Sequence, residues 1–162
     1  MTIYDVFNGD ADGICALTQL RLASPADSVL VTGVKRDINL LARVEAQEGD
    51  EINVLDVSLD KNRAGLLKVL GQGARVFYAD HHFAGEIPES DRLTTAINTA
   101  ADICTSILVD GHIGGRFRLW AVTGAFGDNL DKSAHALGKG QVDDDQAALL
   151  KQLGTYLNYN GY

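Results

Sequence analysis

The chain has 162 residues, of which 46% are hydrophobic and 22% are charged. This size and composition fit one globular domain with a buried core and argue against a disordered or fibrous chain. Fourteen Lys and Arg residues against twenty-two Asp and Glu residues give a formal net charge of -8, which argues against a grip on duplex nucleic acid through positive charge. Carboxylates that hold divalent cations can still recruit a phosphate substrate, so nucleotides are not excluded.

Short apolar segments alternate with helix-like stretches. Near-continuous apolar strands separated by helices predict an α/β fold, in which a parallel, doubly wound sheet of about five strands carries helices on both faces. A helical C-terminal part follows the sheet. In chain order we expect a strand over 3–7, a helix over 14–22, a strand over 29–32, a helix over 37–45, a strand over 52–55, a helix over 62–70, strands over 76–79 and 93–97, helices over 103–108 and 117–125, and a last helix that begins in the acidic run 142–145 and ends near 157.

No segment of the sequence predicts export or membrane insertion. The N-terminus runs directly into a strand-like segment without a signal-peptide pattern, and no apolar run reaches the ~20 residues that span a bilayer. The two cysteines, Cys15 and Cys104, lie far apart in a chain whose size needs no disulfide. We therefore expect a cytoplasmic protein, with both cysteines buried as small apolar side chains.

Acidic side chains and two histidines follow three of the predicted strands. Ligands of an open α/β sheet bind at the carboxyl ends of its strands. Two carboxylates about 4 Å apart repel by roughly 4 kcal/mol at an effective dielectric constant near 20, so these acids are either spread over solvated loops or hold a metal ion. We favour a metal ion because apolar strands deliver the acids to one sheet edge, and mixed carboxylate and imidazole ligands suit Mn²⁺, with Mg²⁺, Zn²⁺ and Co²⁺ as alternatives. The residues are Asp10 and Asp12 after the first strand, Asp56 after the third, and Asp80, His81 and His82 after the fourth.

Four motifs stand in order along the chain. They are Asp-Ala-Asp-Gly at 10–13, the lone Asp56, Asp-His-His at 80–82 and Gly-Ala-Phe-Gly-Asp-Asn at 124–129. Their order and spacing resemble the motifs of the DHH phosphoesterase superfamily, which includes RecJ-type exonucleases, oligoribonucleases, cyclic-dinucleotide phosphodiesterases and manganese-dependent pyrophosphatases. The resemblance extends from about residue 3 to about residue 130, which is most of the chain.

The resemblance implies a centre of two manganese ions. Asp10 is then a ligand of the first metal, Asp12 is a ligand of the second, and Asp56 bridges both. His81 and Asp128 complete the shell of the second metal. Mg²⁺ or Co²⁺ could replace manganese in such a site.

The resemblance also implies roles for the remaining motif residues. His82 faces the substrate phosphate, and Asp80 orients its neighbours. A lone histidine after a strand is commonly a packed or surface residue, but the adjacent His81 favours function for His82. One position departs from the family pattern, because Asn8 stands near the place of a histidine or acidic ligand. An amide oxygen is a poorer ligand, so we expect the first metal to bind weakly.

These residues predict a metal-dependent phosphoesterase, an exonuclease-like hydrolase acting on phosphodiester or phosphomonoester bonds of nucleotides or short oligonucleotides. The alternative is a non-catalytic regulatory domain that binds metal or nucleotide with a weakened first site. The sequence leaves the oligomeric state open and predicts no membrane partner.

The family resemblance also bears on the extent of the domain. Members normally carry a C-terminal substrate-binding domain, and the segment after Asp128 is too short for one. We expect residues 1–162 to form a single DHH catalytic domain, cut from a longer protein. Thr105 and Ser106 fall in a predicted helix and receive no role. The basic pair of Lys35 and Arg36 is interpreted as part of a solvated loop rather than as a phosphate contact.

Overall fold

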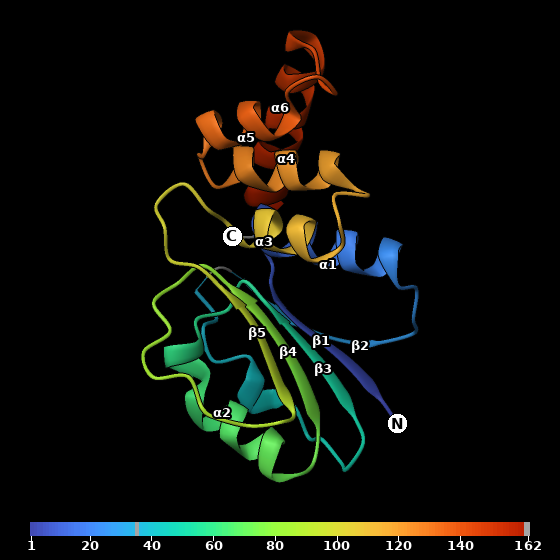
Figure 1. The fold of residues 1–162 in the computed structure, drawn as a ribbon, viewed down its shortest axis with the longest axis vertical. Coiled ribbons are helices and arrows are strands. Elements are labelled where there is room, and N and C mark those ends of the chain that lie inside the picture. The colour runs from blue at the N-terminus through green and yellow to red at the C-terminus, as the bar shows by residue number, and fades with distance from the viewer. Residues whose placement is uncertain (35, 161–162) are drawn as a thin grey trace.

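The computed structural model describes residues 1–34 and 36–160, and over this part of the chain it contains one sheet of five parallel strands (Figure 1). Lys35 of the basic pair lies outside the described residues. The strand order is β2-β1-β3-β4-β5. The second strand is added on one side of β1 and the later strands on the other side, so the order of strand addition reverses between β1 and β3. The prediction of a parallel sheet is confirmed, with every strand within one residue of its expected bounds. The strands are β1 (Ile3–Asn8), β2 (Val29–Gly33), β3 (Glu51–Leu55), β4 (Arg75–Asp80) and β5 (Leu93–Ile97).

Helices cover both faces of the sheet, as expected for a doubly wound fold (Figure 1). On one face, α2 (Leu59–Gly71) packs over the strands in an apolar core that contains the fully buried Tyr78. On the other face, α1 (Ala11–Ala23) and α3 (Thr105–His112) share a second core with the buried Leu55. Burial on both faces explains why the inner strands are almost continuously apolar.

Three further helices, α4 (Arg118–Gly127), α5 (Asp131–Gly138) and α6 (Asp144–Asn160), form the helical C-terminal part. Figure 1 shows them stacked beyond α1 and α3. They enclose a third apolar core around Phe126. The sequence did not predict α5, which has only eight residues and whose fully buried positions are the small Ala134 and Gly138. Among the described residues, every helix is too short or too polar to cross a bilayer.

The prediction of a helix over 37–45 is wrong. The part of this segment that is helical is a single 3₁₀ turn, η1 (Leu41–Arg43). The buried side chain of Asn62 in α2 replaces the helical hydrogen bonds, since its Nδ2 donates to the carbonyl of Ile38 at 2.6 Å and its Oδ1 accepts from the N–H of Leu41 at 3.1 Å. The segment therefore lies along α2 and contributes side chains to the first core.

Both cysteines are buried free thiols, as expected from the sequence. Burial raises the pKa of Cys15 and of Cys104 well above the ordinary range, and neighbouring Asp12 adds to both shifts. Neither thiol is therefore set up as a nucleophile.

The helices α1, α4 and α6 meet at a pair of glycines. A Cβ atom on Gly154 of α6 would lie 2.7 Å from the carbonyl oxygen of Thr123 and 2.9 Å from the backbone nitrogen of Gly127 in α4. A Cβ atom on Gly127 would in turn overlap the Cβ atom of Ala11 at the start of α1. The absence of side chains at both positions lets the three helix backbones approach closely.

We expect Gly154→Ala to lower the free energy of unfolding by about 1–3 kcal/mol, because the added methyl group forces α4 and α6 apart. Gly111→Ala in α3 is the matched control, since a Cβ atom there would meet open space. The control should leave stability unchanged or raise it by up to about 1 kcal/mol. Urea unfolding followed by circular dichroism measures both variants, and equal stabilities would contradict the close crossing.

Candidate metal centre

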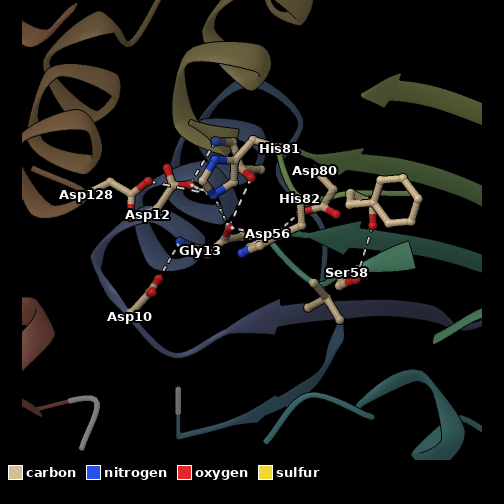
Figure 2. Close-up of polar contacts among 12 residues, drawn as sticks. Asp10, Asp12, Gly13, Asp56, Ser58, Asp80, His81, His82 and Asp128 are labelled. Atoms are coloured by element: carbon tan, nitrogen blue, oxygen red, sulfur yellow. Dashed lines mark hydrogen bonds and ion pairs between the residues drawn. The ribbon is translucent and has the colours of Figure 1, made fainter. Parts of the chain in front are cut away.

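A cleft of about 190 Å³ opens at the carboxyl ends of the strands, at the point between β1 and β3 where the order of strand addition reverses. Ligand sites of open α/β sheets lie at such a reversal. Six of the eight residues singled out in the sequence line this cleft. The other two, Asp12 and Asp80, are buried beside it (Figure 2). The lining residues are Asn8, Asp10, Asp37, Ile38, Asp56, Val57, Ser58, His81, His82 and Asp128.

Asp10 forms the start of α1. Its carboxylate accepts a hydrogen bond from the N–H of Gly13 at 3.2 Å, which pairs one of the backbone donors that a helix start leaves open. A Cβ atom on Gly13 would overlap the backbone of Asn8, so the glycine lets the first helical turn fold back over the end of β1. This cap explains why α1 begins three residues before the predicted start at residue 14.

Asp12 joins α1 to α3. Its side chain is 1% exposed, and its two carboxylate oxygens accept the N–H groups of Thr105 and Ser106, each at 2.7 Å. The hydroxyl of Ser106 also donates to the carbonyl oxygen of Asp12 at 2.9 Å. The carboxylate therefore caps the N-terminus of α3, where the helix dipole favours negative charge.

Thr105 and Ser106 thus shape the site, although the sequence analysis gave them no role. The hydroxyl of Thr105 also donates to Asp56 at 3.2 Å, so this residue contacts two of the clustered acids. A Thr-Ser pair at a helix start is a typical N-terminal signal. What the sequence did not contain was the identity of the acid that lies 93 residues away.

Asp56 is held in an unfavourable place. It has a φ of 59°, in the left-handed region that non-glycine residues seldom adopt, and it is 2% exposed. Burial raises the pKa of Asp56 well above its ordinary value, and the carboxylates of Asp12 and Asp10 raise it further. A buried carboxyl group in such surroundings binds a proton or a cation.

His81 is the point on which the acids converge (Figure 2). Its Nε2 lies 3.4 Å from Asp56, 3.7 Å from Asp128 and 3.9 Å from Asp12. Its Nδ1 lies 3.1 Å from the carbonyl oxygen of Ile103, an acceptor that places the proton on Nδ1 and directs the lone pair of Nε2 toward the acids. Metal-binding histidines are oriented by this kind of hydrogen bond.

His82 and Asp80 form a second pair. The fully buried Asp80 accepts a hydrogen bond from Nδ1 of His82 at 2.7 Å. This bond raises the pKa of His82, against the effect of burial, and the carboxylates of Asp128 and Asp12 act in the same direction. The side chain of His82 is 45% exposed, and its ring lines the cleft.

The residues present fit a divalent cation. The side chains of Asp12, His81 and Asp128 offer ligand atoms within 4.8 Å of one another, and so do those of Asp56, His81 and His82. Within the described part of the chain, the buried Oδ1 of Asn8 has no hydrogen-bond partner. An unpaired buried oxygen costs about 1–3 kcal/mol, a cost that a cation beside it would remove. Carboxylate, imidazole and amide oxygen together suit Mn²⁺, Mg²⁺, Zn²⁺ or Co²⁺.

Comparisons with known proteins identify the fold. No family model and no curated protein matches the sequence. A manganese-bound RecJ exonuclease matches 99% of this chain and 49% of its own, with 19% identity and a TM-score of 0.56. The DHH domain of a member of a ribosomal protein family matches 98% of this chain and 47% of its own, with 11% identity and a TM-score of 0.70. RecJ from Thermus thermophilus, in complex with Mn²⁺, matches 98% of this chain and 35% of its own, with 16% identity and a TM-score of 0.50.

The chain therefore has a DHH/RecJ-like α/β fold, as the four motifs predicted. It spans about half the length of the first two matched structures and about a third of the last. At these identities the comparisons define the fold, and the chemistry has to be inferred from the site itself.

We expect Asp56→Asn to raise the free energy of unfolding of the metal-free protein at pH 7 by about 1–3 kcal/mol, because it removes the cost of charging or protonating this buried carboxyl group and keeps the shape of the side chain. Folded Asp56 holds its proton to a higher pH than the unfolded chain does. The wild-type protein therefore loses stability as the pH rises from the ordinary pKa toward neutrality, and the variant should lose less.

Thermal melts in EDTA between pH 4 and pH 8 measure this difference. Asp27→Asn, a change at an exposed acid before β2, is the control and should follow the wild type. With Mn²⁺ added, the order should invert if Asp56 is a metal ligand, because only the wild type keeps a carboxylate at this position. If Mn²⁺ stabilises the wild type and Asp56→Asn by the same amount, Asp56 is not a metal ligand.

Proposed function

We propose that this domain is a divalent-metal-dependent phosphoesterase that hydrolyses phosphodiester or phosphomonoester bonds of nucleotides or short oligonucleotides with two manganese ions. The observation that carries the proposal is the approach of the carboxylates of Asp12, Asp56 and Asp128 to within 3.9 Å of one imidazole nitrogen. The DHH/RecJ-like fold supports it, and the two matched RecJ structures contain manganese.

In this proposal the ligands divide into two sets. Asp10 and the amide oxygen of Asn8 would hold the first ion, and Asp12, His81 and Asp128 would hold the second. Asp56 would be a ligand of both. The four carboxylates bring four negative charges, which two divalent ions neutralise, so the cleft can then accept a phosphate anion.

When bound, the ions would lower the pKa of a water molecule and neutralise charge on the phosphoryl oxygens. The chain's own groups complete the reaction. His82 stands at the cleft, and its raised pKa favours the protonated ring, which can donate a hydrogen bond to a phosphoryl oxygen or a proton to the leaving group. Asp80 keeps the ring in place and stabilises its protonated form.

Substrate size follows from charge and space. A net charge of -8 repels a long polyanion outside the site, and the cleft of about 190 Å³ accommodates a phosphate with part of a nucleotide. We infer that the substrate is a nucleotide or a short oligonucleotide rather than a duplex. The proposed setting is the cytoplasm, where two buried free thiols persist, and residues 1–162 are the proposed catalytic unit.

A second function is favoured by one observation. Asn8 offers a neutral oxygen where a histidine or a carboxylate would bind a metal more strongly. A weakened first metal site favours a regulatory domain that binds metal or nucleotide without turnover. The two functions differ in metal content and in hydrolysis, so one experiment separates them.

The experiment is a panel of dinucleotides, cyclic dinucleotides, pyrophosphate and single-stranded DNA, incubated with the protein and Mn²⁺. We expect two manganese ions per chain and hydrolysis of at least one nucleotide substrate. One tightly bound ion without hydrolysis would favour the regulatory domain. No bound metal and no bound nucleotide would contradict both functions.

A further prediction concerns the pH profile of hydrolysis. If protonated His82 is required, activity falls as the pH rises through the pKa of this histidine. Asp80→Asn removes the hydrogen bond to a carboxylate that raises this pKa, so the fall should move to lower pH. The alkaline limb of the profile of kcat against pH measures the shift, with Asp27→Asn as the control. If this limb lies at the same pH in Asp80→Asn and in the wild type, His82 is excluded as the proton donor.

A further inference from the structure

Asn158, in the last turn of α6, bridges two other helices. Its Oδ1 accepts a hydrogen bond from the N–H of Ala11 at 2.8 Å, and its Nδ2 donates to the carbonyl oxygen of Gly127 at 2.7 Å. These contacts join residues 147 and 31 positions apart in the sequence. One amide side chain therefore pairs the first N–H of α1 and the last carbonyl group of α4, two groups that helix geometry leaves without a partner of their own.

Both bridged residues adjoin candidate metal ligands. Ala11 lies between Asp10 and Asp12, and Gly127 directly precedes Asp128. The two segments approach the cleft from different helices, and α1 and α4 are themselves in contact where Gly127 packs on Ala11. A change in the spacing of α1 and α4 would therefore move Asp12 relative to Asp128, both of which lie within 3.9 Å of His81.

The geometry of α6 supports this function for Asn158. Gly154, one helical turn earlier, permits the close approach of α6 to α4. Asn158 then reaches both backbones with its short side chain. Asparagine carries a donor group and an acceptor on the same amide, and this bridge uses both.

We propose that Asn158 is a positioning residue for the metal centre, which fixes the ligand segments of α1 and α4 relative to each other and so sets the affinity for the ions. This inference rests on the proposed function, since it concerns the same metal site. Outer groups that orient metal ligands typically contribute about 10- to 100-fold to metal affinity.

The test is Asn158→Leu, which keeps the approximate shape of the side chain and removes both hydrogen bonds. We expect the dissociation constant for Mn²⁺, measured from the electron paramagnetic resonance signal of the free ion, to rise by about tenfold or more. The matched control is Gln152→Met, which removes an amide side chain from the same helix. The Nε2 atom of Gln152 donates to the hydroxyl of Tyr156, a contact that stays within α6. The control should bind Mn²⁺ as the wild type does.

Circular dichroism at the temperature of the binding assay establishes that each variant is folded. If Asn158→Leu does not fold, Asn158→Asp decides, because it keeps the acceptor for Ala11 and loses the donor to Gly127, and it too should weaken Mn²⁺ binding. Wild-type affinity in a folded variant at position 158 would overturn the proposal. Absence of Mn²⁺ binding by the wild-type chain would instead overturn the proposed function.

Discussion

Repulsion among buried carboxylates is the constraint on which the site depends. Asp12 and Asp56 are almost fully buried and lie close to the same imidazole nitrogen. A marginally stable domain tolerates such a cluster only if backbone donors, protons or cations compensate the charge. The amide groups of α3 compensate Asp12, while burial and neighbouring carboxylates raise the pKa of Asp56. The fold thus holds an arrangement that is costly unless a proton or a cation compensates the buried charge.

Most of the fold could be predicted because the inner strands are buried on both faces. Runs rich in apolar and β-branched residues that end at polar residues located the five described strands, and the parallel order followed from the helices between them. The wrong prediction, a helix over 37–45, came from apolar residues at helical spacing. Their backbone is instead paired by Asn62, a long-range contact that no local pattern contains. The missed α5 has a different cause, since this helix has only eight residues and the two that are fully buried, Ala134 and Gly138, are small.

The site divides in the same way. Residues that follow strands were located from the sequence, because the sheet itself carries Asp56 and His81 to one edge. Asp128, which follows α4, was indicated by the family resemblance, but the polar residues that act on the site from α3 and α6 were not located. Thr105 and Ser106 contact the acids from α3, and Asn158 contacts the ligand segments from α6. Each is an ordinary polar residue in a helix, and its importance comes from tertiary contacts with residues far away in the chain.

The two hydrogen bonds from α3 to Asp12 constrain which substitutions a protein with this fold can accumulate. The carboxylate that would hold a metal ion also fastens two helices together, so its loss would weaken the architecture even where no reaction takes place. Selection for foldability alone would therefore retain an aspartate at this position long after catalysis had been abandoned. Replacement of Asp12 would therefore break the junction of α1 and α3, whereas replacement of the more exposed Asp128 or His82 would leave that junction in place.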